Sequence, residues 1–167
     1  MIAKNTAKEE VIQKGQCPDG LGCEPCKTGC RYGGGTLAAE DIPPLARFLG
    51  VSEEELRKGY LEEITRFGTT LFKTKARRHD GKPYGPCVFF DEKRGCTVHP
   101  VKPLECKVSI HTEDGEAHSL WFALNYFVRP DDLESLRQWE QYLKLGHPTI
   151  PGGTVEQLQK KQTNGGT

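Results

Sequence analysis

The sequence predicts a small, loop-rich α+β domain, with short helices and a few short antiparallel strands around a cysteine-bound metal. A chain of 167 residues is long enough for one domain. It contains 19 glycines and 11 prolines, so a large share of it must lie in turns and loops. Only 35% of the residues are hydrophobic, and seven are cysteines. We therefore expect a bound metal or a partner to support a modest core.

The expected helices of the N-terminal half have recognisable beginnings and ends. Residues 3–14 form a short polar helix before the first cysteines. In "DIPPLARFLG", Asp41 is the expected cap, the prolines suit the first turn, and Gly50 ends the helix. The next helix begins at Ser52, which forms a capping-box pattern with Glu55. Its apolar positions, spaced to share one helical face, are Leu56, Tyr60 and Ile64.

The C-terminal half mixes strand and helix patterns. "TTLFKTKARR" is typical of a strand, and "CVFFDEKRGCTV" of a strand, a turn and a second short strand. A turn is expected at "EDGE" and a helix in "DDLESLRQWEQYLKLG", followed by a short helix over residues 155–161. The stripe of that longer helix includes Leu133, Leu136, Tyr142 and Leu143. We expect an N-terminal helix over 1–14, one metal-cluster domain over 15–146 and a flexible tail over 147–167.

Charge and hydropathy narrow the possible environments. The 23 basic and 23 acidic residues cancel, so nothing favours nucleic acid or an anionic membrane as a partner. "MIAKNTAKEE" lacks the apolar core of a signal peptide, and "LWFALNYFV" is about half the length of a membrane span. We therefore expect a cytoplasmic protein without a membrane span. Seven thiols in a reducing compartment indicate metal or redox chemistry rather than stable disulfides.

The cysteines form two groups separated by a largely helical stretch. The first is Cys17-x5-Cys23-x2-Cys26-x3-Cys30, and the second is Cys87-x8-Cys96-x9-Cys106. A C-x2-C pair can hold one metal atom or adjacent irons, but such a loop rarely encloses a metal by itself. The second group is the expected source of the remaining ligands.

Zinc and an iron–sulfur cluster both remain open from these spacings. A structural zinc site uses four ligands, often as two close pairs, whereas only the first group offers such a pair. One zinc would also leave three thiols over. A cluster tolerates wide spacing and favours loops whose backbone approaches the sulfurs, which the neighbouring glycines allow. Seven thiols fit one 4Fe-4S cluster with spare cysteines, or a larger or second cluster.

The motifs "C-x2-C-x3-C", "DI-x2-LA-x2-LG-x-S-x-EE" and "PCVFFDEKRGCTVHPVKPLECK" follow one another between Cys23 and Lys107. In this order they resemble the CxxCxxCC, or YkgJ-type, family of zinc- or iron-chelating cysteine-cluster proteins. That family's first motif ends in two adjacent cysteines, where this chain has Gly29 and then Cys30. The resemblance implies the ligands Cys23, Cys26, Cys30, Cys87, Cys96 and Cys106, with Cys17 as a seventh candidate.

The chain is also similar to the small iron–sulfur protein associated with the membrane methyltransferase of methanogenic archaea, tetrahydromethanopterin S-methyltransferase. That similarity implies a redox- or oxygen-responsive accessory protein that binds a larger enzyme complex and reaches the membrane through this partner. No acid, base or substrate-binding motif accompanies the cysteines, which favours an accessory role over catalysis. The alternatives are an electron-transfer oxidoreductase and a zinc-stapled interaction module.

The other polar and aromatic features have simpler interpretations. His99 follows Cys96 by three residues and is either a zinc ligand or a turn histidine. The triple glycine at 33–35 lacks the Lys-Ser/Thr of a phosphate loop. The basic run 73–82 is expected to be a solvated hairpin, and the aromatic stretch 118–130 either core or a partner surface. Four histidines are expected at the surface or in local hydrogen bonds: His79, His111, His118 and His147.

Overall fold

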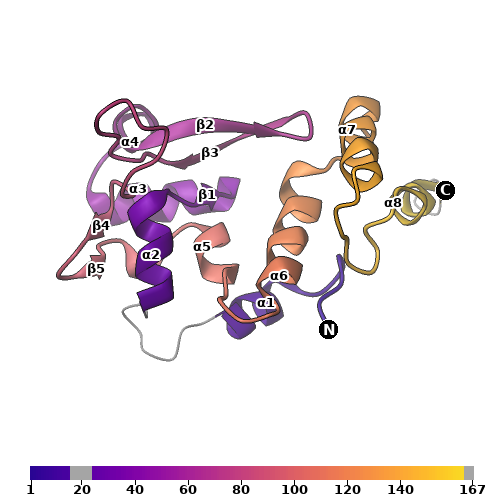
Figure 1. Ribbon diagram of the computed structural model, residues 1–167. Helices are drawn as coiled ribbons and strands as arrows, with labels where there is room; N and C mark the ends of the chain where they lie inside the picture. Colours follow the sequence, from indigo (N-terminus) through magenta and orange to yellow (C-terminus); the bar gives the residue numbers. More distant parts are fainter. Residues whose placement is uncertain (16–23, 164–167) are drawn as a thin grey trace.

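The chain was analysed as a computed structural model that describes residues 1–15 and 24–163 (Figure 1). Short helices dominate, and short antiparallel strands form two small sheets, which confirms the predicted α+β class. Within the described ranges no helix has both the length and the apolar character needed to cross a membrane.

The larger sheet has the order β1-β3-β2, with both pairs antiparallel. Its strands are β1 (Thr36–Leu37), β2 (Leu61–Arg66) and β3 (Thr69–Thr74). Phe67 and Gly68 connect β2 to β3 and both have positive φ angles, 49° and 73°. Two central residues with positive φ match the right-handed twist of a tight hairpin. The β2–β3 hairpin therefore has a geometrically favourable two-residue turn.

Helix α4 (Glu53–Tyr60) confirms the predicted start but not the predicted length. The Ser52 hydroxyl accepts a hydrogen bond from the Glu55 N–H at 3.1 Å, and the Glu55 carboxylate accepts one from the Ser52 N–H at 3.2 Å. The helix ends at Tyr60, so placing Ile64 on its apolar face was wrong. Ile64 lies in β2 instead, because this segment pairs with β3 along its whole length.

Asp41 has a different role from the expected helix cap. Helix α3 (Ile42–Leu49) ends at Gly50, as predicted, with φ of 69°. The Asp41 side chain makes no capping bond to α3. Its carboxylate accepts hydrogen bonds from the backbone N–H groups of Ala38 and Leu104, both at 2.8 Å. Asp41 thus ties the chain before α3 to the start of α5 (Leu104–Val108).

The C-terminal half is helical, and it packs against α1 (Lys8–Gly15). Helix α6 (Gly115–Phe122) continues into a π-helical turn (Ala123–Phe127), and α7 (Leu133–Lys144) begins after Asp132, whose carboxylate accepts two backbone N–H groups. Leu133 is 84% exposed, so including it in the buried stripe was wrong, whereas Trp139 is completely buried.

The segment after residue 147 contacts the rest of the molecule, although the sequence predicted a flexible tail. Helix α8 (Val155–Thr163) confirms the expected short helix. Ile150 and Leu158 are buried, and the Trp139 indole donates a hydrogen bond to the Gly153 carbonyl at 2.7 Å.

Two groups of buried apolar side chains hold these elements together. The larger group contains Trp121, Phe122 and Phe127 of α6 and the π-helical turn, and the partly buried Tyr126 packs against it, so most of these aromatic side chains are core. The smaller group lies between α3, α4 and the sheet. Beside it is a hairpin of β4 (Phe90–Asp91) and β5 (Gly95–Cys96), which confirms the predicted strand–turn–strand. Helix α2 (Glu24–Tyr32) lies near this hairpin and α5 in Figure 1.

Candidate metal centre

One cavity, with a volume of about 230 Å³, brings the two cysteine groups together. Helix α2 contributes Cys26 and Cys30 of the first group, while the hairpin region and α5 contribute the second. The thiols in its wall are Cys26, Cys30, Cys87, Cys96 and Cys106. The described cysteines of both groups therefore line one cavity, and completion of a metal site by the second group stays a prediction. Cys17 and Cys23 lie outside the described residues.

Local structure explains how these thiols come to face one space. Cys26 and Cys30 are four residues apart on α2 and so share one face of the helix. The Cys87 backbone N–H donates a hydrogen bond to the Cys30 carbonyl at 2.7 Å, which joins the two groups directly. Cys96 ends the short strand β5, and Cys106 lies in the middle of α5.

The glycines after α2 allow the backbone to approach the cavity closely. A Cβ atom at Gly35 would lie closer than 3.0 Å to the Cys106 Sγ, and one at Gly34 would meet the Thr74 side chain and carbonyl. No residue with a side chain could occupy these positions without a shift. Gly35 therefore makes room for sulfur, and Gly34 makes room for strand β3.

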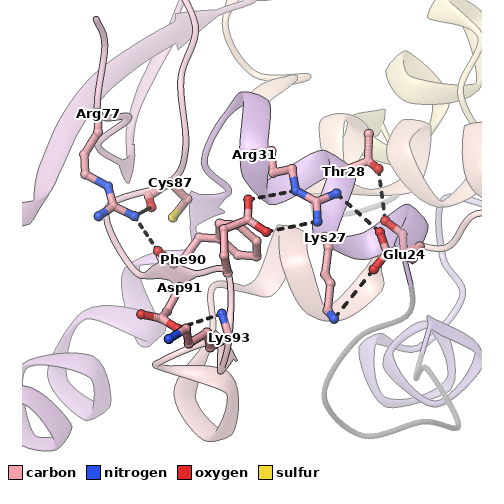
Figure 2. A network of polar contacts seen from close by, with 10 residues as sticks. Glu24, Lys27, Thr28, Arg31, Arg77, Cys87, Phe90, Asp91 and Lys93 are labelled. Carbon is pink, nitrogen blue, oxygen red and sulfur yellow. Dashed lines mark hydrogen bonds and ion pairs between the residues drawn. The ribbon is translucent and has the colours of Figure 1, made fainter.

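An arginine on α2 connects the helix to the hairpin (Figure 2). The Arg31 guanidinium binds both carboxylate oxygens of Glu92, at 2.9 and 3.1 Å, and one oxygen of Glu24 at 3.4 Å. A fork-to-fork pair of this kind fixes the orientation of both side chains as well as their distance. Arg31 therefore helps to hold Cys26 and Cys30 opposite the second cysteine group.

The basic run 73–82 has structural contacts that its sequence did not reveal. The Arg77 guanidinium donates hydrogen bonds to the carbonyl oxygens of Cys87, at 3.3 Å, and Phe90 (Figure 2). Arg78 forms a two-bond pair with Glu62 at 2.9 and 3.0 Å. The sequence predicted a solvated hairpin and gave no sign of these bonds. Through them, Arg77 holds the backbone of Cys87 and Phe90 in place.

The cavity disfavours ionised thiols when no metal is bound. Burial, and after it the negative charge of Cys87, Cys96 and Cys26, raises the pKa of the Cys30 thiol to about 11, while Lys102 acts in the opposite direction. Burial likewise raises the pKa of Cys96, and of Cys106 well above its ordinary value. A metal must therefore displace protons when it binds.

Two histidines also line the cavity, His99 and His111. Burial and the charge of Lys102 lower the pKa of His99. His111 is exposed, as expected, but its Nε2 lies 2.8 Å from the Cys26 Sγ, a contact across 85 residues. The sequence reasoning missed this contact, and the only signal for it was the position of His111 five residues after Cys106.

The remaining described histidines play other parts. His118 is buried, and its Nδ1 lies 2.7 Å from the Val108 carbonyl. The His147 ring stacks on Tyr142 with centroids 4.2 Å apart.

The described ligand-type side chains surround the cavity rather than meet at one point. Among residues 1–15 and 24–163, no three His, Cys, Asp or Glu side chains form a group that could hold a metal ion. The donor set of five thiols and two imidazoles nevertheless has the composition that zinc and iron–sulfur sites use. These residues fit a metal group that fills the cavity and contacts several of its walls.

The family model CxxCxxCC, described as "Putative zinc- or iron-chelating domain", matches residues 22–132. The match includes all five thiols of the cavity and His111. No curated protein and no solved structure matches the chain.

Proposed function

This chain belongs to the CxxCxxCC family, and from that premise we propose that it binds an iron–sulfur cluster in the thiol-lined cavity and acts as a redox- or oxygen-responsive accessory protein of a larger complex. The observation that carries the proposal is the meeting of both cysteine groups around one space. An accessory role suits a site whose described walls consist largely of metal-ligand side chains and glycines.

The size of the cavity favours a cluster over a single zinc ion. Four sulfurs on one zinc lie within roughly 3.8 Å of one another, given a Zn–S bond of about 2.3 Å. The five described thiols instead line a cavity of about 230 Å³, and no three ligand-type side chains of the described residues already form a group that could hold one metal ion. A polynuclear cluster spreads its thiolate ligands around itself, and when bound it supplies one-electron redox chemistry.

The metal would also hold α2 in place. Helix α2 has no buried residue, so apolar packing contributes little to its position. Its attachments include the Arg31–Glu92 pair, the Cys87 N–H bond to Cys30, the Cys26–His111 contact and the packing of Tyr32 against Tyr84. Bonds from Cys26 and Cys30 to a cluster would add strong links, and losing the cluster would loosen the helix.

A loosened α2 would change the outer surface as well as the cavity. Tyr32, the last residue of α2, is 60% exposed, and its ring packs edge-on against Tyr84 with centroids 5.8 Å apart. Lys82 lies 6.0 Å from the Tyr84 ring centre. Exposed aromatic side chains such as tyrosine are common anchors of protein interfaces. We propose that this pair reports the state of the metal site to the partner.

Metal and sulfide analysis tests the cluster. The full chain is purified without oxygen and assayed for iron, zinc, acid-labile sulfide and visible absorption. We expect a coloured protein with iron and sulfide, and loss of both in Cys30→Ala. A colourless protein with stoichiometric zinc and no sulfide would contradict the cluster and favour the zinc-stapled module.

The accessory role needs a separate test. The native chain is used as bait in lysates prepared once with oxygen and once without, and Tyr32→Ala is the matched variant because it leaves the thiols untouched. We expect one partner complex to be held in only one of the two states and lost in the variant. The methyltransferase complex of methanogens is the proposed partner, on the similarity noted above. Equal capture in both states would refute the oxygen response.

A further inference from the structure

His111 is placed in the wall of the cavity by a segment that is fixed on both sides. It follows α5, which carries Cys106, and precedes α6. The Ser109 hydroxyl donates to the Glu105 carbonyl at 2.6 Å, which holds the chain as it leaves α5. On the other side, a Cβ at Gly115 would lie 2.5 Å from the Ile110 carbonyl, so the turn closes tightly around His111.

A buried contact supports the same segment from inside. The His118 ring on α6 lies 2.7 Å from the Val108 carbonyl, the last residue of α5. The position of His111 is therefore set by contacts among α5, α6 and the turn between them. None of these contacts involves α2, yet the imidazole Nε2 lies 2.8 Å from a thiol on that helix.

The separation suits two ligands of one metal atom. Tetrahedral geometry with bonds of about 2.3 Å to sulfur and 2.05 Å to nitrogen places the two donor atoms roughly 3.6 Å apart. The Cys26 Sγ and the His111 Nε2 are now 2.8 Å apart. To bind the same metal atom, they would have to move apart by less than about 1 Å. Because Cys26 is on a helix without buried residues, such a movement costs little.

We propose that His111 is a metal ligand and that its Nε2 and the Cys26 thiolate bind the same metal atom. This inference rests on the metal centre proposed above. An imidazole contributes no negative charge, so it relieves repulsion in a site otherwise built from thiolates. Replacing thiolate by imidazole on an iron also raises the reduction potential of the cluster.

The family motif offers an independent reason for a ligand at this place. The name CxxCxxCC describes two adjacent cysteines at the end of the first motif, where this chain has Gly29 and Cys30. Gly29 is three residues after Cys26 on α2, so both lie on the cavity side of the helix, and a Cβ at Gly29 would meet nothing within 4 Å. Compared with the family motif, this chain therefore lacks one thiol next to Cys26 in the cavity wall. The imidazole of His111 supplies a donor atom beside Cys26 instead.

Pulsed electron paramagnetic resonance of the reduced, iron-loaded full chain tests the proposal directly. Protein is prepared with ¹⁵N-labelled histidine, so that a nitrogen bound to iron gives a large hyperfine coupling that changes with the isotope. We expect this coupling in the wild type and in His147→Ala, whose ring stacks on Tyr142 away from the cavity. We expect its loss in His111→Ala, together with metal loss to a chelator that is about 10-fold faster or more.

A second variant separates ligation from a structural role of the ring. His111→Cys replaces the nitrogen donor by a thiolate and should retain the metal while losing the nitrogen coupling. If the purified protein contains zinc without sulfide, the Co²⁺-substituted protein is measured in the same way.

Three results would overturn the inference. A coupling too small for direct bonding would show that His111 only hydrogen-bonds to Cys26, and a large coupling that survives in His111→Ala would assign the nitrogen elsewhere. A metal-free wild-type protein would overturn the metal centre itself, so the two failures are distinguishable.

Discussion

Gly35→Ala is expected to weaken metal binding more than it weakens the fold. The added Cβ would lie closer than 3.0 Å to the Cys106 Sγ, while the next nearest atoms, the Cys106 backbone N and Cβ, are 3.6 and 3.7 Å away. Of these three atoms, only the Cys106 sulfur would clash with the added methyl group. In the metal-free protein the thiol can turn away, at a cost of about 0.5–1.5 kcal/mol for a strained rotamer.

A bound metal removes that freedom, because the Cys106 sulfur must then stay where it ligates. The metal-bound form should carry the full overpacking cost of about 1–3 kcal/mol. Metal binding is weakened only by the difference between the costs in the two forms, roughly 0.5–1.5 kcal/mol. At about 1.4 kcal/mol per factor of ten, this corresponds to a roughly 2- to 12-fold faster loss of metal. The assay is bleaching of the visible absorption in the presence of a chelator, with urea unfolding of the apoprotein measured in parallel.

Gly29→Ala is the matched control, since Gly29 also lines the cavity but has open space at its Cβ. It should stabilise α2 by about 0.5–1 kcal/mol and leave the rate of metal loss unchanged. The reasoning fails if Gly35→Ala releases metal at the wild-type rate, or if Gly29→Ala releases it equally fast.

Six further variants follow from the contacts of the site and of the fold. Cys26→Ala and Cys96→Ala, from separate groups, should each abolish stoichiometric metal binding, and full metal content in either would refute the shared site. Arg31→Gln should speed metal loss at low salt and less so at high salt, because it removes an exposed ion pair between α2 and the hairpin; a salt-independent rate difference would contradict this. Gly29→Cys in a His111→Ala background should restore metal content, as measured by iron analysis, without restoring the nitrogen coupling. Asp41→Ala should destabilise the apoprotein by about 1–3 kcal/mol in urea unfolding, because it leaves two backbone N–H groups without their acceptor. Burial raises the pKa of Asp41 above 3.8, so folding disfavours its ionised form, and stability should fall as pH rises from about that value through the folded pKa. Asp41→Asn should remove this pH dependence, and an unchanged pH profile would refute the assignment.

Local patterns predicted the start and stop signals of the fold well. The Ser52–Glu55 capping box, the Gly50 stop and the short C-terminal helix involve residues close in the chain, and the structure contains all three. Local patterns could not predict the residue at which α4 ends. Tyr60 and Ile64 have helical spacing, but hydrogen bonding of β2 to β3 outweighs a preference worth only a few tenths of a kcal/mol per residue.

By itself the sequence determined that there are two groups of cysteines, one of them containing a C-x2-C pair, and enough glycine to let the backbone approach sulfur. The tertiary structure decided which groups share a cavity and what else faces it. Asp41 binds the start of α5 instead of capping α3, and His111 meets Cys26 across 85 residues. The physical reason is that a motif fixes side chains within one or two turns of each other. Contacts between distant segments depend on how helices and hairpins pack, and the spacing along the chain carries no record of that packing.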